Sequence, residues 1–205
     1  MSSTAVQVAS EPPGDLPTAA PRRHLSHRQA RTVHRLTEAA VLELGDGGYG
    51  ALSVRSVAKR AGVAPATAYT YFGSKEHLVA EVFWRRFEAQ PARAADRRRS
   101  PAARATDVLL DFALVVADET ELAAACTVAL LADDPEVSEL RLRIGGEMHR
   151  RLLAALGDDV DPLAVATLEL ATSGALLQVG TGHLGYDALP ALLADVATIV
   201  LRGAT

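Results

Sequence analysis

The feature that most constrains the fold is a pair of short helical patterns around one glycine, in the stretch "SVRSVAKRAGVAPATAYTYF" that begins at Ser53. Ser53 is suited to cap a helix over 54–60, and Gly62 suits a tight turn after it. Pro65 fits the first position of a second helix over 65–72, where its missing N–H costs nothing. Two short helices joined by a tight turn make a helix-turn-helix, whose second helix can enter the major groove of DNA.

The rest of the chain is predicted to be helical as well. Apolar residues make up 49% of the 205 positions but aromatic residues only 4%, so the core must consist largely of Ala, Val and Leu. Ala and Leu favour helix, and the alternation of β-branched and aromatic residues that is typical of strands is nearly absent. The predicted fold class is therefore all-α.

Helix boundaries follow from capping residues and breakers. Residues 1–24 are rich in Pro, Ser, Thr and Ala without a period, which predicts a disordered tail. A first helix is expected over 26–44, ended by "GDGGYG", and Ser74 is suited to cap a helix that reaches about Gln90. Further helical patterns cover 101–117, 120–132, 135–156, 162–183 and 188–202.

Several classes of protein are disfavoured. The single cysteine, Cys126, excludes an intramolecular disulfide and a cysteine-based zinc cluster, and no His–acid pair has convincing metal spacing. Neither a signal peptide nor a run of eighteen uninterrupted apolar residues is present, so we predict a cytoplasmic protein without a membrane span. His149, His183 and Cys126 offer no pairing of nucleophile and base, so neither catalytic residues nor a cofactor is predicted.

Charge divides the chain into a basic front and an acidic back. Residues 22–104 hold 16 Arg or Lys against 7 Asp or Glu, whereas residues 105–205 hold 5 against 16. A basic half suggests contact with a polyanion. Arginines near the start of the first helix fit either a DNA-contacting arm or a solvated face: Arg22, Arg23, Arg28, Arg31 and Arg35.

The helix over 65–72 has two different faces. Ala68 and Phe72, four residues apart, are expected to face inward. The outward and flanking positions carry hydroxyl groups and no acids, as a surface that meets phosphates requires. Lys75, early in the next helix, adds a positive charge. The outward and flanking residues are Ala66, Thr67, Tyr69, Thr70 and Tyr71.

These residues resemble a known family. "LSVRSVAKRAGVAPATAYTYFGSKEHL" is similar to the DNA-binding domain of TetR-type transcriptional repressors over about residues 28–85. Three positions depart from the family pattern: Ala64 stands where a capping Ser is usual, Ala66 where Gly is usual, and Ala68 where a core Leu is often found. The resemblance implies a helix-turn-helix domain over 25–73 and a larger helical domain for effector binding and dimerisation over 74–205.

The resemblance also implies roles for individual residues. Ser53, Thr67, Tyr69, Tyr71 and Lys75 would contact phosphates of double-stranded operator DNA. Ala66, Thr67 and Thr70 would lie nearest the bases, and Arg55 would lie near the DNA backbone. For Tyr69 and Tyr71, packing against the first helix is the alternative to phosphate contact.

The back half is predicted to form a homodimer and a sensor. The last two helices, 162–183 and 188–202, carry small residues and an apolar face that fit a dimer interface, with intramolecular core as the alternative. Helices over 101–156 would enclose a largely apolar effector pocket. Candidate lining residues, each open to being plain core instead, are Trp84, Phe87, Phe112, Cys126, Met148, Gln178 and His183.

The predicted function is an effector-responsive repressor that binds a palindromic operator as a homodimer. Effector binding would shift the population between two spacings of the recognition helices, with the helix from Lys75 to Gln90 as the lever. The alternative is a helical dimer that binds small molecules or proteins and not DNA.

Overall fold

The computed structural model describes residues 27–93, 96–157 and 159–202, and these residues form helices joined by loops. The prediction of an all-α chain is confirmed, whereas the predicted tail over 1–24 lies outside the described residues. The helices, with one turn of 3₁₀-helix called η1, are α1 (His27–Ala51), α2 (Val54–Arg60), α3 (Pro65–Tyr71), α4 (Lys75–Ala89), α5 (Pro101–Ala113), α6 (Thr120–Leu130), α7 (Pro135–Leu156), α8 (Pro162–Gly180), η1 (Tyr186–Ala188) and α9 (Leu189–Arg202).

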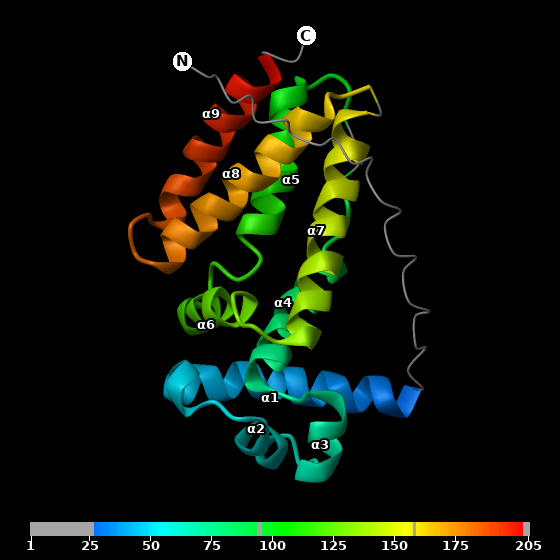
Figure 1. The fold of residues 1–205 in the computed structure, drawn as a ribbon, viewed down its shortest axis with the longest axis vertical. Coiled ribbons are helices and arrows are strands. Elements are labelled where there is room, and N and C mark those ends of the chain that lie inside the picture. Colours follow the sequence, from blue (N-terminus) through cyan, green and yellow to red (C-terminus); the bar gives the residue numbers. More distant parts are fainter. Residues whose placement is uncertain (1–26, 94–95, 158, 203–205) are drawn as a thin grey trace, which may run out of the picture.

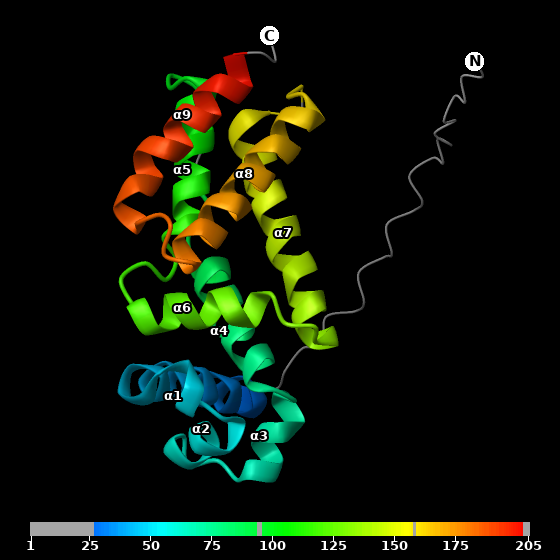
Figure 2. The ribbon, with the colours of Figure 1, turned by 60° about the vertical axis from the view of Figure 1, so that its left-hand side comes forward.

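The helices lie in two parts that follow one another along the long axis of the molecule (Figure 1). α1 crosses one end, with α2 and α3 on its outer side, and α4 rises from this end into the larger part. There α5 packs against α7 and α9, while α6 lies crosswise between α1 and the remaining helices (Figure 2). The part formed by α1, α2 and α3 thus lies at one tip of the molecule, away from α8 and α9.

The core of the small part forms because α1 presents apolar residues at helical spacing. Leu36, Ala40 and Leu44 are buried, and they share one cluster with Val57 of α2 and Ala68 of α3. This spacing of four places the three α1 side chains on a single stripe. The stripe fixes α1 as the platform on which α2 and α3 rest.

The predicted break in "GDGGYG" is confirmed at Gly48, whose backbone is not helical, but the helix extends past the predicted end at Leu44 and resumes after this kink to Ala51. Gly48 has φ 66°, in the left-handed region that favours glycine. Contacts from other helices hold the segment in place. Tyr49 donates a hydrogen bond to Glu76 over 2.8 Å, and Asp46 pairs with an arginine of α2. These tertiary contacts hold the residues on both sides of the kink.

Sequence and structure agree on α2 and on the turn after it. Ser53 accepts a hydrogen bond from the backbone N–H of Ser56 over 3.0 Å and forms a capping box with it. Gly62 has φ 61° and therefore makes the tight turn that an L side chain would strain. Pro65 lies at the start of α3, as predicted, and Ala64 is an N-cap without a side-chain hydrogen bond.

We expect Ala64→Ser to stabilise the protein by about 1 kcal/mol, because a serine hydroxyl can accept from an N–H that Ala64 leaves without a side-chain partner. Urea denaturation followed by circular dichroism measures the change. Ala64→Val, which adds no acceptor, serves as the control and should not stabilise. Equal stability of Ala64→Ser and the wild type would contradict the expectation.

Helices α4 and α7 are tied together at both ends. At their starts, the Ser74 hydroxyl donates to a carboxylate oxygen of Asp134 over 2.6 Å, while each residue also caps its own helix. This hydrogen bond from Ser74 is the main reason why the pKa of Asp134 lies below its ordinary value. At the far end, Arg151 of α7 donates to the carbonyl oxygens of Phe87 and Gln90 over 2.9 and 3.1 Å. The two helices therefore run parallel and are joined along their length.

Three of the later helices end earlier than the sequence predicts. α5 ends at Ala113 instead of residue 117, because residues 114–117 form turns, and α6 ends at Leu130 instead of residue 132. α8 ends at Gly180, two residues before Gly182, whose φ of 77° stops a helix.

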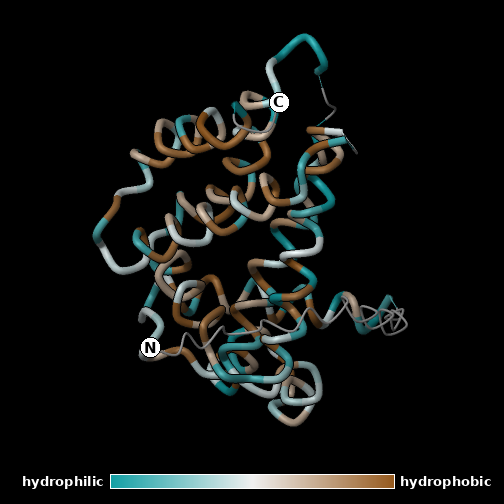
Figure 3. Tube along the Cα trace, turned by 45° about the horizontal axis from the view of Figure 1, so that its top comes forward, coloured by the Kyte–Doolittle hydropathy of each residue, from teal (hydrophilic) through white to brown (hydrophobic). Residues whose placement is uncertain are grey.

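Helix α8 is long and apolar enough to cross a membrane by length and composition alone. Here it packs against α5, α6, α7 and α9, and its residues Val165, Leu168 and Thr172 are buried. Apolar residues nevertheless recur all along the helices near the C-terminus (Figure 3), and some of them lie on the surface.

Candidate nucleic-acid interface

The recognition helix α3 presents the face that its sequence predicts. Ala68 and Phe72 are buried, at 0% and 2% exposure, and hold α3 against α1 and α2. The outward residues Ala66, Thr67 and Thr70 are exposed. The Thr70 hydroxyl donates to the Ala66 carbonyl oxygen over 3.0 Å, which leaves its methyl group and oxygen available at the surface.

The two tyrosines of α3 differ in their surroundings. Tyr69 is 51% exposed, a high value for a large side chain. Tyr71 is half-buried and packs against the core, and it also lines a groove between α3 and α1. Packing and phosphate contact are therefore compatible for Tyr71, whereas about half of Tyr69 is exposed and available for contact.

The other predicted contact residues surround α3. Ser53 and Arg55 are exposed at the start of α2. Lys75 is half-buried at the start of α4; its ammonium group donates to the Tyr49 carbonyl oxygen over 3.0 Å and lies 4.1 Å from the centre of the Tyr49 ring. Lys75 thus has a structural partner in addition to any phosphate that it meets.

A basic groove of about 760 Å³ runs between the first turns of α1 and helix α3. Its α1 side carries three of the five arginines identified from the sequence, Arg28, Arg31 and Arg35. The other two, Arg22 and Arg23, lie outside the described residues. Thr67 and Tyr71, which both carry hydroxyl groups, line the opposite wall. The charged and titratable groups that line this groove are Arg28, Arg31, His34 and Arg35. Such a groove can hold a phosphate backbone.

Comparison with known proteins identifies the family. The family model for bacterial regulatory proteins of the tetR family matches residues 36–82. An HTH-type transcriptional regulator of Mycobacterium tuberculosis is 45% identical over 181 residues, which cover 87% of this chain and 84% of that protein. The chain belongs to the TetR family of transcriptional regulators.

Two further regulators show how far the likeness extends. The HTH-type transcriptional repressor KstR of Rhodococcus jostii is 32% identical over 69% of this chain and 68% of its own length. The crystal structure of FadR from Bacillus subtilis, in complex with stearoyl-CoA, aligns with a TM-score of 0.55 at 21% identity over 84% of this chain and 99% of FadR. That second likeness is one of fold.

The larger domain of this TetR-family chain brings most of the predicted effector residues into its core. Phe87 and Phe112 meet edge to face at 5.0 Å between ring centres, and Trp84, Cys126 and Met148 are buried nearby in the same cluster. Gln178 and His183 are exposed instead. Their assignment to an interior pocket is therefore corrected: α8 turns Gln178 outward, and His183 follows the end of the helix at the surface.

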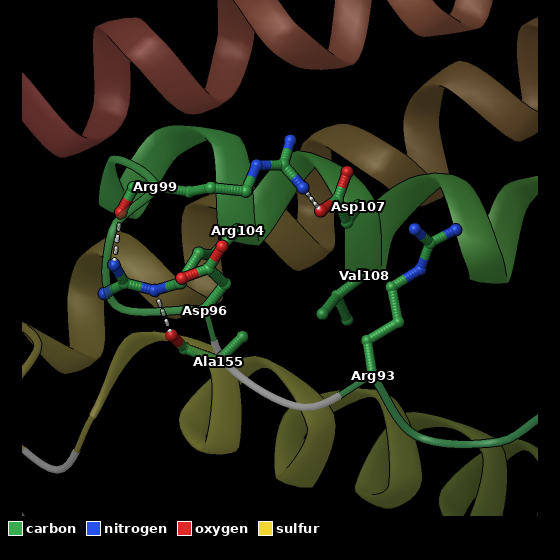
Figure 4. A pocket seen from close by; sticks show the side chains of 7 residues that line it. All are labelled: Arg93, Asp96, Arg99, Arg104, Asp107, Val108 and Ala155. Atoms are coloured by element: carbon green, nitrogen blue, oxygen red, sulfur yellow. Dashed lines mark hydrogen bonds and ion pairs between the residues drawn. The ribbon is translucent and has the colours of Figure 1, made fainter.

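A second hollow, of about 220 Å³, lies at the start of α5 and differs from an apolar pocket. Figure 4 shows Arg104 donating to the carbonyl oxygens of Arg99 and Ala155, and Arg99 paired with Asp107. Arg93 forms a two-pronged ion pair with Asp111. The charged groups here bind one another, and the hydrogen bond from Arg104 to Ala155 joins the start of α5 to α7. This hollow is therefore not an apolar cavity.

The chemistry of a catalytic site is also missing at Cys126. Burial raises the pKa of its thiol to about 12, which keeps it protonated and unreactive. Among the described residues no group of three or more His, Cys, Asp or Glu side chains could hold a metal ion.

Sequence reasoning missed two residues that organise the molecule. Arg151 is only 6% exposed, and Asp134 connects the starts of α4 and α7. Asp134 carried a visible signal, since "DDPE" marks a helix start, but its partner Ser74 lies sixty positions earlier. No local pattern distinguishes Arg151 from its exposed neighbour Arg150.

Proposed function

We propose that this transcriptional regulator is a cytoplasmic homodimer that represses genes by binding a palindromic operator and is released by a small apolar effector. The observation that carries the DNA-binding part is the outer face of α3, which is exposed and free of acids while Ala68 and Phe72 anchor its inner face. The basic groove beside α3 adds four positively charged or titratable side chains. Such a surface matches duplex phosphates in charge and in hydrogen-bond donors.

A pair of substitutions on α3 separates positioning contacts from base contacts. Tyr71→Phe should weaken binding to every duplex by about tenfold, because it removes a donor to a charged acceptor. Thr70→Ala should instead change the preference among operator variants, because a threonine methyl can touch a thymine methyl. Both are measured by fluorescence anisotropy on promoter DNA that flanks the protein's own gene.

The same titrations test the proposed function as a whole. Binding of the wild-type protein should weaken steeply as salt concentration rises, since bound phosphates release counterions. Negligible affinity that does not depend on salt would reject DNA binding and favour the alternative, a helical dimer that binds small molecules or proteins.

The dimer is proposed on the exposed apolar residues of α8 and α9. Leu163, Leu170 and Leu177 recur every seven residues along α8, and Leu192 and Ile199 do so on α9. Seven residues are close to two helical turns, so each set forms a stripe. Exposed stripes of this kind mark an interaction site. A two-fold pair would bring two recognition helices to successive turns of the operator.

An apolar effector is proposed from the composition of the core around α4. The rings of Phe83, Phe87 and Phe112 meet edge to face or tilted, with ring centres 5.0–6.5 Å apart, and alanines fill much of the remaining core. The stearoyl-CoA held by the FadR neighbour supports an acyl-type ligand by fold likeness. Because α4 is tied to α7 at both ends, a ligand that displaces either helix would move the start of α4 and the domain attached to it.

A further inference from the structure

Arg35 lies on α1 but makes its contacts across the helix-turn-helix. Its guanidinium group donates to the carbonyl oxygen of Ala61 and, over 3.2 Å, to that of Gly62. Ala61 is the C-cap of α2, and Gly62 is the turn residue before α3. One exposed side chain therefore joins α1 to the segment that sets where α3 begins.

The chemistry of this contact suits a fixing role. The last carbonyl groups of a helix have no partner within the helix and carry partial negative charge, which favours a cation there. Both hydrogen bonds come from one terminal nitrogen of Arg35, and the planar guanidinium fixes the directions of its two N–H groups, whereas the ammonium of a lysine rotates freely.

The turn and the guanidinium are closely fitted to each other. A Cβ atom at Gly62 would lie 3.0 Å from a terminal nitrogen of Arg35. Gly62 therefore supports this contact in two ways. It adopts the left-handed backbone of the turn, and its missing side chain leaves room for the guanidinium of Arg35.

We infer that Arg35 is a positioning residue for operator recognition: it holds the turn after α2 so that α3 keeps one orientation relative to α1. The alternative role, a phosphate contact like those available to its groove neighbours, is one of the two that the sequence alone leaves open, the other being a solvated face. Arg28, Arg31 and His34 line the same groove, and Thr67 and Tyr71 face them from α3. Arg35 differs from the neighbouring basic residues because its guanidinium is bound to two backbone carbonyls.

The inference rests on the proposed DNA binding, and the test uses the full chain with two duplexes. One duplex is selected from a random pool by the wild-type protein, and the other is a scrambled sequence of the same length. The variants are Arg35→Gln, Arg35→Lys and the matched control Arg31→Gln, one helical turn away in the same groove. Affinity is measured across a range of salt concentrations, and thermal unfolding is recorded for each variant.

We expect Arg35→Gln to lower the ratio of specific to non-specific affinity by about tenfold, with the salt dependence on the scrambled duplex unchanged. Arg35→Lys should restore part of that ratio, because an ammonium can reach one carbonyl oxygen. Arg31→Gln should weaken binding to both duplexes in parallel. It should also make the slope of log affinity against log salt shallower by about 0.9 for each phosphate that is no longer neutralised.

Three results would overturn the inference. A shallower salt slope for Arg35→Gln would make Arg35 a phosphate contact. An equal loss of affinity for both duplexes, together with a lower unfolding temperature, would make its role merely structural. Unchanged affinity for both duplexes would show that it has no role in recognition. Amide hydrogen exchange needs no DNA, so it tests the positioning role of Arg35 even if the proposed DNA binding is wrong. It should accelerate by about tenfold at residues 61–71 in Arg35→Gln and not in Arg31→Gln, and unchanged exchange would also reject the inference.

Discussion

Leu170→Asp is expected to convert the proposed dimer into monomers, raising the dimer dissociation constant at least about a hundredfold. Leu170 is 74% exposed in the isolated chain and lies midway along the apolar stripe of α8. Burying one leucine is worth roughly 1.5–3 kcal/mol, and a two-fold interface contains two copies. A carboxylate in the interface would add a desolvation cost. Sedimentation equilibrium measures the change.

Leu142→Asp is the matched control for this prediction. Leu142 is 75% exposed, almost the same as Leu170, but it lies on α7 outside the stripes of α8 and α9. This substitution should leave the dimer intact. Operator affinity should fall with Leu170→Asp alone, since one recognition helix then meets the DNA without its partner. A stable Leu170→Asp dimer, or dissociation by both variants, would reject the interface on α8 and α9.

The helix-turn-helix was predictable because its signals are local. Ser53 caps α2, Gly62 adopts a positive φ, and Pro65 begins α3, and each of these roles depends on residues only a few positions apart. The inward positions Ala68 and Phe72 follow from the same short-range periodicity. For this part of the chain, residue chemistry alone determines both the elements and the face that remains exposed.

Other parts were not predictable because they depend on contacts between distant residues. The helical turns on both sides of the kink at Gly48 are held by contacts with α2 and α4, and no local signal reports those partners. The apolar spacing that identified Trp84 and Phe112 as buried cannot distinguish a pocket wall from packed core. Gln178 was predicted to line an interior pocket but is exposed, since a helix with apolar residues on all sides does not reveal which face turns outward.

Arg151→Ala is expected to lower the free energy of unfolding by about 3 kcal/mol, because it removes a buried charge whose hydrogen-bond partners remain. The guanidinium donates to Phe87 and Gln90 at the end of α4 and to Glu147 over 2.7 Å, and it lies 4.3 Å from the centre of the Phe87 ring. Without it, the two carbonyl oxygens at the end of α4 have no guanidinium donor. Urea denaturation at neutral pH measures the loss of stability.

Arg150→Ala distinguishes this anchoring from a general effect of charge. Arg150 binds the same carboxylate, but its side chain is 58% exposed, so its removal should change stability little at neutral pH. Arg150 and then Arg151 lower the pKa of Glu147 from 4.5 to about 2. A lowered carboxylate pKa stabilises the fold above the unfolded value and loses that contribution as pH falls from about 4.5 towards 2. Arg150→Ala should therefore flatten the acid branch of the stability curve only by the small amount that it lowers stability at pH 7, whereas Arg151→Ala should lower stability at pH 7 by much more. Equal losses from the two variants at pH 7 would show that the carbonyl oxygens at the end of α4 do not depend on Arg151.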